Sequence, residues 1–193
     1  VGSEWSISSI AEAANGEKFL GEFGVDDEVA LNFENLGRHE SVVVAFDLYI
    51  IRSWDGNYEG DYLFGGQTYR LGPDHWGMKS DGQLLMKTTF SNNTGQYGIL
   101  YRQAFPDNYR QGDYSPGYGA REENTLGYTY NGLPMDAIYE IRLQFEHDTP
   151  NLNLNFFSDA VELQRTSTGF ESFNSIHNES WGIDNLQVIL VDD

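Results

Sequence analysis

The longest apolar run of the chain predicts a central β-strand. In residues 41–51 most side chains are β-branched or aromatic, without the spacing that gives a helix one apolar face. Such a run is typical of a strand that is covered on both faces. We therefore expect this strand at the centre of a sheet.

Alternating patterns predict most of the other strands. In residues 137–146, for example, apolar and polar side chains take turns, which is the period of a strand with one buried face. The sequence Ser80-Asp81-Gly82-Gln83 has the residues of a tight hairpin turn. Further strands are expected in residues 17–23, 27–33, 61–71, 76–79, 84–90, 151–156, 160–164 and 181–191.

About nine or ten predicted strands, with little helix, indicate an all-β fold, an antiparallel β-sandwich of the jelly-roll type. A chain of 193 residues can form one such sandwich. We expect an N-terminal arm or edge strand in residues 1–16, where Ser9 and Glu12 have the spacing of a helix capping box. A single domain follows in residues 17–193.

Residues 91–136 interrupt the strand pattern of this domain. They are rich in Gly, Tyr, Asn and Gln, and a structureless segment of this length is unusual inside a compact domain. The dense tyrosines favour an ordered contact surface, and the alternative is an excursion that packs passively over one sheet face.

The charge of the chain narrows the choice of partners. Thirty acidic residues against 11 lysines and arginines give a net charge of −19. This charge repels nucleic-acid phosphates and anionic lipids, and it favours cations. No apolar run reaches the roughly 18 residues that span a bilayer. We therefore expect neither a nucleic-acid partner nor membrane insertion.

Cysteine is absent, which fits bacterial extracellular proteins that rely on metal ions and core size instead of disulfides. The chain begins at Val1 instead of Met, as expected for a processed or trimmed chain. We expect a secreted or cell-surface protein.

Regularly spaced oxygen ligands follow the central run. Asp55, Asn57, Glu59 and Asp61 occupy alternate positions, as in the first half of a calcium loop, because hard cations bind several carboxylate and carbonyl oxygens. The twelfth loop position is Gly66, where an EF-hand has a bidentate glutamate, so an EF-hand is not expected. The loop is either a Ca²⁺ site or an acidic, glycine-rich surface loop.

Aromatic side chains beside polar ones suggest a second kind of site. Sugar rings stack on aromatic faces while neighbouring carboxylates and amides bind their hydroxyls. Trp54, Tyr58 and the pair Asp74 and Trp76 are candidates for such a contact surface, although each tryptophan could instead close the end of the core. Asn92 and Asn178 begin the two N-glycosylation sequons.

Signatures of common enzymes are missing. The chain has no G-x-S-x-G, no H-E-x-x-H and no phosphate-binding Gly-Lys-Ser/Thr motif. Glu140 and Glu146 share a predicted strand face, but along an extended strand they lie roughly 20 Å apart, too far to act on one glycosidic bond. We therefore expect a protein that is not an enzyme.

Three motifs carry a resemblance to a known family. They are FLGEFG in residues 19–24, FDLYIIRSWDGN in residues 46–57 and ESWGIDN in residues 179–185. Together they resemble a widespread family of bacterial extracellular jelly-roll domains found in secreted, surface-anchored and adhesin-like proteins. The closing strand is also similar to the end of calcium-binding carbohydrate-binding modules and of MAM-type sandwiches.

This resemblance implies a shared structural Ca²⁺. Its ligands would be Asp184 at the start of the last strand and Glu22 in the opening strand, with Glu179 and Asn185 as further candidates. Asp184 alternates with the apolar Leu186 and Val188, which predicts a core-facing carboxylate, and such a group needs a compensating partner.

Three functions fit these observations. The first is a structural subunit of a surface or filament assembly, which self-associates by adding its N-terminal strand to a neighbour. The second is a carbohydrate-binding or adhesive module whose partners are extracellular glycans. A glycan-processing enzyme is the third and has the least support.

Overall fold

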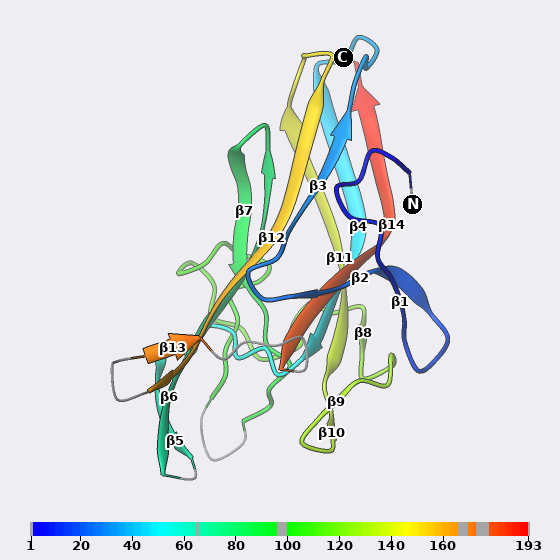
Figure 1. Cartoon of the computed structure of the whole chain (residues 1–193). Helices are drawn as coiled ribbons and strands as arrows, with labels where there is room; N and C mark the ends of the chain where they lie inside the picture. The colour runs from blue at the N-terminus through cyan, green and yellow to red at the C-terminus, as the bar shows by residue number, and fades with distance from the viewer. Residues whose placement is uncertain (1, 65, 96–99, 166–169, 173–177, 193) are drawn as a thin grey trace.

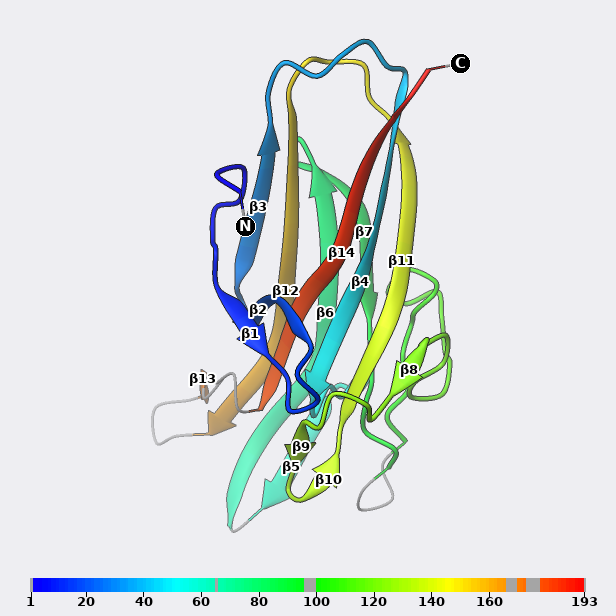
Figure 2. The same cartoon turned by 90° about the vertical axis from the view of Figure 1, so that its right-hand side faces the viewer.

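Two antiparallel sheets pack face to face (Figures 1 and 2). We describe them in a computed structural model, in residues 2–64, 66–95, 100–165, 170–172 and 178–192. Within these ranges the chain contains strands, turns and bends but no α-helix, and none of it could cross a membrane as a helix. The prediction of an all-β, antiparallel fold is confirmed.

The first sheet has the central apolar run in its middle, as predicted. Its strands follow the order β1 (Ile10–Glu12), β2 (Lys18–Gly24), β14 (Glu179–Val191), β4 (Ser41–Arg52), β11 (Asp136–Glu146) and β8 (Glu122–Glu123). One face of β4 contributes to the main core, and the other packs with Phe19 and Leu126 in a smaller cluster. This double cover explains why β4 has an apolar run and not an alternating pattern.

The second sheet lies against the main core from the other side. Its strands follow the order β13 (Phe170–Ser172), β12 (Leu152–Arg165), β6 (Gln67–Ser80) and β5 (Gly60–Phe64), while β3 (Glu28–Phe33) also pairs with β12 and β7 (Gln83–Thr89) with β6. The strand predicted in residues 61–71 is instead the hairpin of β5 and the start of β6. A separate hairpin joins β9 (Thr129–Tyr130) and β10 (Leu133–Pro134).

Three fully buried tryptophans lie in the core between the sheets. Trp54 follows β4, Trp76 lies in β6 and Trp181 in β14, and each is 0% exposed. The rings of Trp76 and Trp181 contact each other edge to face at 6.1 Å, across the two sheets. Aromatic packing therefore joins the sheets in the half of the sandwich that also contains the site below.

The N-terminal arm binds to the edge of its own second sheet. Trp5 bridges to Leu31 of β3, and its ring lies 5.9 Å from that of Phe156. The predicted helical turn at Ser9 and Glu12 is wrong: this segment forms β1, which pairs with β2. Strand pairing supplies partners for its backbone that an isolated helical turn would lack.

The excursion of residues 91–136 is fixed to the sandwich by Gln103. This side chain is 0% exposed, and its Oε1 accepts hydrogen bonds from the backbone of Ser91 and Gly117 and from the hydroxyl of Tyr139 on β11. Its Nε2 donates to the carbonyl of Tyr118. One buried amide thus ties distant parts of the excursion to a core strand.

Candidate metal centre

Three buried carboxylates meet inside the sandwich, at the end where β4 stops and β14 begins. They belong to Asp55, Asp74 and Glu179, which are 5%, 0% and 0% exposed. One oxygen of each lies within 4.8 Å of an oxygen of the other two. This cluster, called the acidic triad below, was not predicted as a group.

The strand pattern explains why the triad is interior. Asp74 lies on the same face of β6 as Trp76 and Met78, and both of these belong to the main core. Glu179, the first residue of β14, shares its face with the core residue Trp181. The second sheet thus contributes one carboxylate, and the first sheet contributes Glu179 and, just beyond β4, Asp55.

The turn after β4 holds Asp55 in position. Its backbone N–H donates to the Asp74 carboxylate, and its Oδ1 accepts a 3.1 Å hydrogen bond from Asn93. Gly56 has a φ of 65°, and a Cβ there would lie 2.2 Å from the carbonyl oxygen of Arg102. Glycine is therefore required for the close approach of this turn to the excursion.

Burial makes the triad electrostatically costly. Desolvation raises the pKa of Asp55 from its ordinary value to about 7, and the hydrogen bond from Asn93 opposes that shift only in part. Neighbouring carboxylates disfavour one another's charge, and an interior charge needs compensation. Protons, cationic partners or a bound ion can compensate such a cluster.

The donor set fits a hard divalent cation. Ca²⁺ binds carboxylate oxygens at about 2.4 Å, so two oxygens on one ion are at most about 5 Å apart, and the triad satisfies that limit. Among the described residues the donors are all carboxylate oxygens, which hard cations prefer. Asp55, Asp74 and Glu179 are the residues that would hold the ion.

The predicted loop does not gather its side chains around one point. Only Asp55 points into the triad. Asn57 accepts a hydrogen bond from Thr89 and donates one to the carbonyl of Gly112, and Asp61 forms an ion pair with Arg70 on the neighbouring strand. The chain turns into β5 at residue 60, so Glu59 and Asp61 are exposed and the spacing of a calcium loop is lost.

The prediction that Asp184 faces the core is wrong. The register of β14 against β4 shifts between Asp184 and Gln187, and Asn185 in this bulge has a φ of 53°. Before the bulge the odd-numbered residues of β14 face the core, whereas after it Leu186 and the following even-numbered residues do. Asp184 pairs with Asp47, on the outer face of the sheet.

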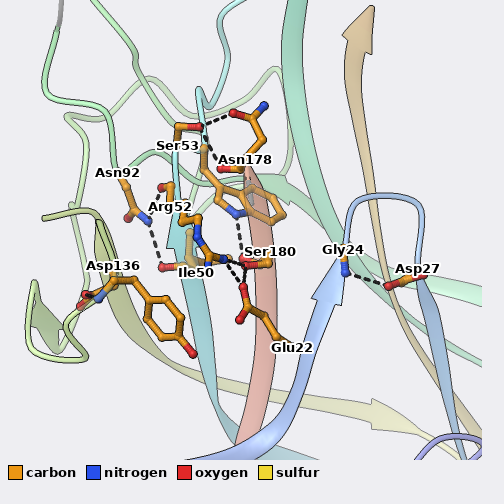
Figure 3. A network of polar contacts seen from close by, with 12 residues as sticks. Glu22, Gly24, Asp27, Ile50, Arg52, Ser53, Asn92, Asp136, Asn178 and Ser180 are labelled. Carbon is orange, nitrogen blue, oxygen red and sulfur yellow. Dashed lines mark hydrogen bonds and ion pairs between the residues drawn. The ribbon is translucent and has the colours of Figure 1, made fainter. Parts of the chain in front are cut away.

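The implied pairing of Glu22 with Asp184 is also contradicted. Glu22 forms an ion pair with Arg52 and accepts a hydrogen bond from the Ser180 hydroxyl (Figure 3). Asn185 donates to Asp47 at 2.7 Å, so its amide fixes the bulge. Of the four residues implied by the resemblance, only Glu179 lies in the triad.

Arg52 contacts four segments, three through its side chain and one through its backbone carbonyl. Besides Glu22 on β2 it donates to Ser180 on β14, and its guanidinium carbon lies 5.0 Å from the ring centre of Tyr128. The backbone carbonyl of Arg52 accepts a hydrogen bond from the side chain of Asn92 (Figure 3). Arg52, at the end of β4, therefore links β2 and β14 to the excursion of residues 91–136.

Neither tryptophan can serve as a sugar platform. Trp54 and Trp76 are fully buried, and the indole nitrogen of Trp54 donates to the carbonyl of Ser180 at 2.9 Å. The alternative that they close the core is the correct one. Asp74 belongs to the triad, and the ring of Tyr58 packs on Tyr101 at 5.3 Å, so the four residues form no common surface.

The sequons are engaged in the fold. The Asn92 amide nitrogen donates to the carbonyls of Ile50 and Arg52, and a glycan on that nitrogen would remove these bonds. Asn178 accepts a hydrogen bond from Ser53, and Ser180, which completes its sequon, is fully buried. Glycosylation of these asparagines stays a prediction, and at Asn92 it would compete with hydrogen bonds of the fold.

Comparisons with protein-family models, curated proteins and solved structures find no match to this chain. The fold and the acidic triad therefore define the protein only as a class, an antiparallel β-sandwich with carboxylates between its sheets.

Proposed function

We propose that this protein is a calcium-stabilised, non-enzymatic β-sandwich that acts outside the cell as a structural subunit of a surface or filament assembly. The acidic triad is the observation that carries the proposal. Three carboxylates on core-facing positions of two sheets are explained by an ion that compensates their charge and joins the sheets.

The strand order supports a jelly-roll fold. Four strands of the first sheet follow the order β2, β14, β4 and β11, and four of the second follow β3, β12, β6 and β7. Every described pairing is antiparallel, and successive strands of the set β2, β3, β4 and β6 alternate between the sheets. A jelly roll of eight strands wound as two Greek keys would have this order, which supports the proposal.

Burial of the triad supports a stabilising role over a catalytic one. With Asp55 at 5% exposure and the other two carboxylates at 0%, a sugar or peptide would have to open the core to reach them. An ion enclosed there during folding contributes to stability without contacting a substrate.

Calcium binding is tested by thermal unfolding and calorimetric titration of chelator-treated protein. We expect CaCl₂ to raise the melting temperature, and an ion present at 1,000 times its dissociation constant adds about 4 kcal/mol to the free energy of unfolding. Unchanged melting together with no heat of binding would contradict the proposal.

Matched variants locate the ion. Asp74→Asn combined with Glu179→Gln keeps the shape of the site, and we expect it to lose the calcium response without losing stability in chelator, because the buried like charges are gone. Asp61→Asn removes a carboxylate from the predicted loop, and we expect it to respond to calcium like the parent. If Asp61→Asn lost the calcium response and the double variant kept it, the ion would be assigned to that loop instead.

For the assembly step we propose that the arm of one copy binds along β3 of its neighbour. In one chain this contact uses Trp5 and two backbone hydrogen bonds, from Ser6 to Ala30 and from Asn32 to Glu4, and the same groups could pair between copies. Removing residues 1–9 should abolish polymers seen by electron microscopy while circular dichroism still reports a folded sheet. Polymers that persist without the arm would exclude this step.

A glycan-binding role remains the second candidate because of two tyrosines in the excursion. The rings of Tyr114 and Tyr118 stack at 4.6 Å, and Tyr118 is 53% exposed. An exposed aromatic face of this kind can stack on a sugar. Glycan-array binding that is lost in Tyr118→Ala would support this role, and an array without binding would exclude it.

A further inference from the structure

The C-terminal half of β14 is an edge of the first sheet. β4 pairs with β14 as far as Val191, whereas β2, on the other side, pairs only with Ser180, Trp181 and Ile183. In the described part of the chain no strand continues the sheet beyond residues 186–191, which we call the β14 edge and which lie at the right of the sheet in Figure 1. The backbone groups on that side are therefore open to a strand from another molecule.

Side chains on the β14 edge are incompletely covered. Val44, in the adjacent strand, is 0% exposed. The core-facing side chains of the edge pack against the same core but are only partly buried, and they are Leu186, Val188 and Leu190. On the outer face, Ile189 is 41% exposed. A strand added here would remove apolar surface from water on both faces of the sheet.

Most other strand edges are covered or short. The N-terminal arm lies along β3, and the excursion lies along β7, where the Tyr109 N–H donates to the carbonyl of Lys87. β1, β5 and β13 have three to five residues each. Covered edges and short edge strands are two ways in which proteins prevent pairing with other chains.

β11 provides the closest comparison. β8 pairs with its first residues, up to Ile138, so the rest of β11 has a strand on one side only. Glu140, Arg142 and Glu146 place charges along that stretch, which opposes strand addition. The β14 edge has no charged residue. Of the long edges that the structure describes, it is therefore the one without such protection.

Charge identifies the occupant of the β14 edge. A net charge of −19 makes two copies repel each other when their charged faces approach. The sequence LQVILV of residues 186–191 is neutral, so two copies can approach there without bringing like charges together. Antiparallel pairing of a strand with itself is also compatible with two-fold symmetry, the commonest symmetry of protein dimers. These properties favour a second copy of this chain over a charged peptide.

We propose that β14 of one copy pairs with β14 of a second copy, antiparallel, about a two-fold axis at Ile189. Even-numbered residues of the edge face the core, so the two cores lie on one side of a joined sheet only when odd-numbered residues meet odd-numbered residues. With the axis at Ile189, Gln187 lies opposite Val191 of the second copy, and Val188 lies opposite Leu190 of the second copy. The six strands of each first sheet then form one continuous sheet of twelve.

Charged residues that flank the edge set this register. An axis at Val188 would place Asp184 opposite Asp192 of the second copy, and like charges directly opposite destabilise a pair of strands. With the axis at Ile189, Asp192 of the second copy instead lies near the start of β2. Lys18, whose side chain is 66% exposed, provides an opposite charge there.

Sedimentation of the full chain tests the dimer. We expect an equilibrium of monomer and dimer, and Ile189→Lys should raise the dissociation constant at least about tenfold, because two ammonium groups would meet at the axis. Gln144→Lys adds the same charge to the outer face of β11, away from the edge, and should dimerise like the parent. Circular dichroism checks that both variants fold. A parent that is monomeric at its highest soluble concentration, or equal effects of the two substitutions, would overturn the proposal.

Single cysteines test the register without adding charge. The chain has no cysteine, so Ile189→Cys introduces two thiols that face each other at the axis, on residues with Cα atoms about 4.5–5.5 Å apart, which a disulfide can bridge. Gln187→Cys is the matched control on the same face, and its two thiols would lie roughly 13 Å apart along the strands. Mild oxidation should give a covalent dimer of Ile189→Cys and little of Gln187→Cys. Equal yields for both variants, including none for either, would overturn this pairing.

Trp5→Ala in the full chain separates this contact from the assembly by the N-terminal arm proposed above. The arm lies on β3 in the other sheet, so this variant should weaken polymers while the dimer keeps its dissociation constant. A dimer that is lost together with the polymers would be assigned to the arm, and the β14 contact would be overturned.

Discussion

At the residue scale, the guanidinium of Arg52 compensates the charge of Glu22, the carboxylate that the family resemblance implied as a Ca²⁺ ligand. Their side chains are 15% and 14% exposed, so both are largely removed from water. A buried ion pair stabilises a protein little more than apolar residues of similar volume would. Removal of one partner, however, leaves the other charge buried without compensation. Glu22 is thus satisfied within the protein and needs no ion.

Arg52→Met tests this account. Methionine keeps an unbranched apolar side chain and removes the charge, and we expect a loss of about 3 kcal/mol in the free energy of unfolding, measured with urea. Adding Glu22→Gln should restore much of the loss. Arg38→Met, which removes an 86% exposed partner of Glu40, should cost less than about 0.5 kcal/mol. Equal effects of the two arginine substitutions would contradict a buried pair.

At the element scale, the bulge of β14 decides which carboxylates enter the core. Its extra residue lets Trp181 and Leu186 both face inward although their numbers differ in parity. In a regular strand aligned by Leu186, the residues with even numbers would face the core, so Asp184 would point inward and Trp181 outward. The bulge therefore lets Glu179 face the core while Asp184 stays on the outer face.

Asn185 is the residue on which the bulge depends. Asparagine and glycine tolerate its φ of 53°, whereas a β-branched side chain does not. Asn185→Gly and Asn185→Val both lose the hydrogen bond to Asp47, so their difference isolates the backbone conformation. We expect the valine variant to be less stable by about 1–2 kcal/mol in urea unfolding. Two equally stable variants would show that this conformation is not required.

At the scale of the whole molecule, polar side chains from different strands and loops meet at both ends of the sandwich. The acidic triad lies at the end where β14 begins, and His39 Nε2 and His147 Nδ1 lie 2.7 Å apart at the end where it stops. The aromatic core lies between them.

Proton and calcium binding compete at the triad, which gives a prediction for the intact protein. The pKa of Asp55 is raised to about 7, whereas an unfolded aspartate titrates near 3.9. Without calcium the folded state therefore loses stability as pH rises from about 4 to 7, by at most about 1.4 kcal/mol per pH unit. Calcium needs the ionised form, so the difference in melting temperature between calcium and chelator should grow from pH 5 to pH 8.

Asp55→Asn serves as the control for this prediction. It removes the titrating carboxylate. The difference in melting temperature between calcium and chelator, and the increase of that difference with pH, should therefore both be smaller than in the parent. An equal calcium effect at pH 5 and pH 8 in the parent would show that Asp55 does not exchange its proton for the ion.

Asking which carboxylates fall on the apolar side of a strand would have found most of the acidic triad. Asp74 precedes Trp76 by two positions, and Glu179 precedes Trp181 in the same way. The loop spacing after β4 identified Asp55 correctly but grouped it with Asn57 and Asp61, which the turn into β5 sends elsewhere.

The sequence by itself determined the elements, because side-chain periodicity is a local property of each strand. It determined that β4 is covered on both faces, that the fold is all-β and antiparallel, and that residues 91–136 depart from the strand pattern. Only the tertiary structure decided which polar groups meet. Asp55, Asp74 and Glu179 are distant along the chain, as are His39 and His147, and strand order, the β14 bulge and the turn after β4 bring each set together.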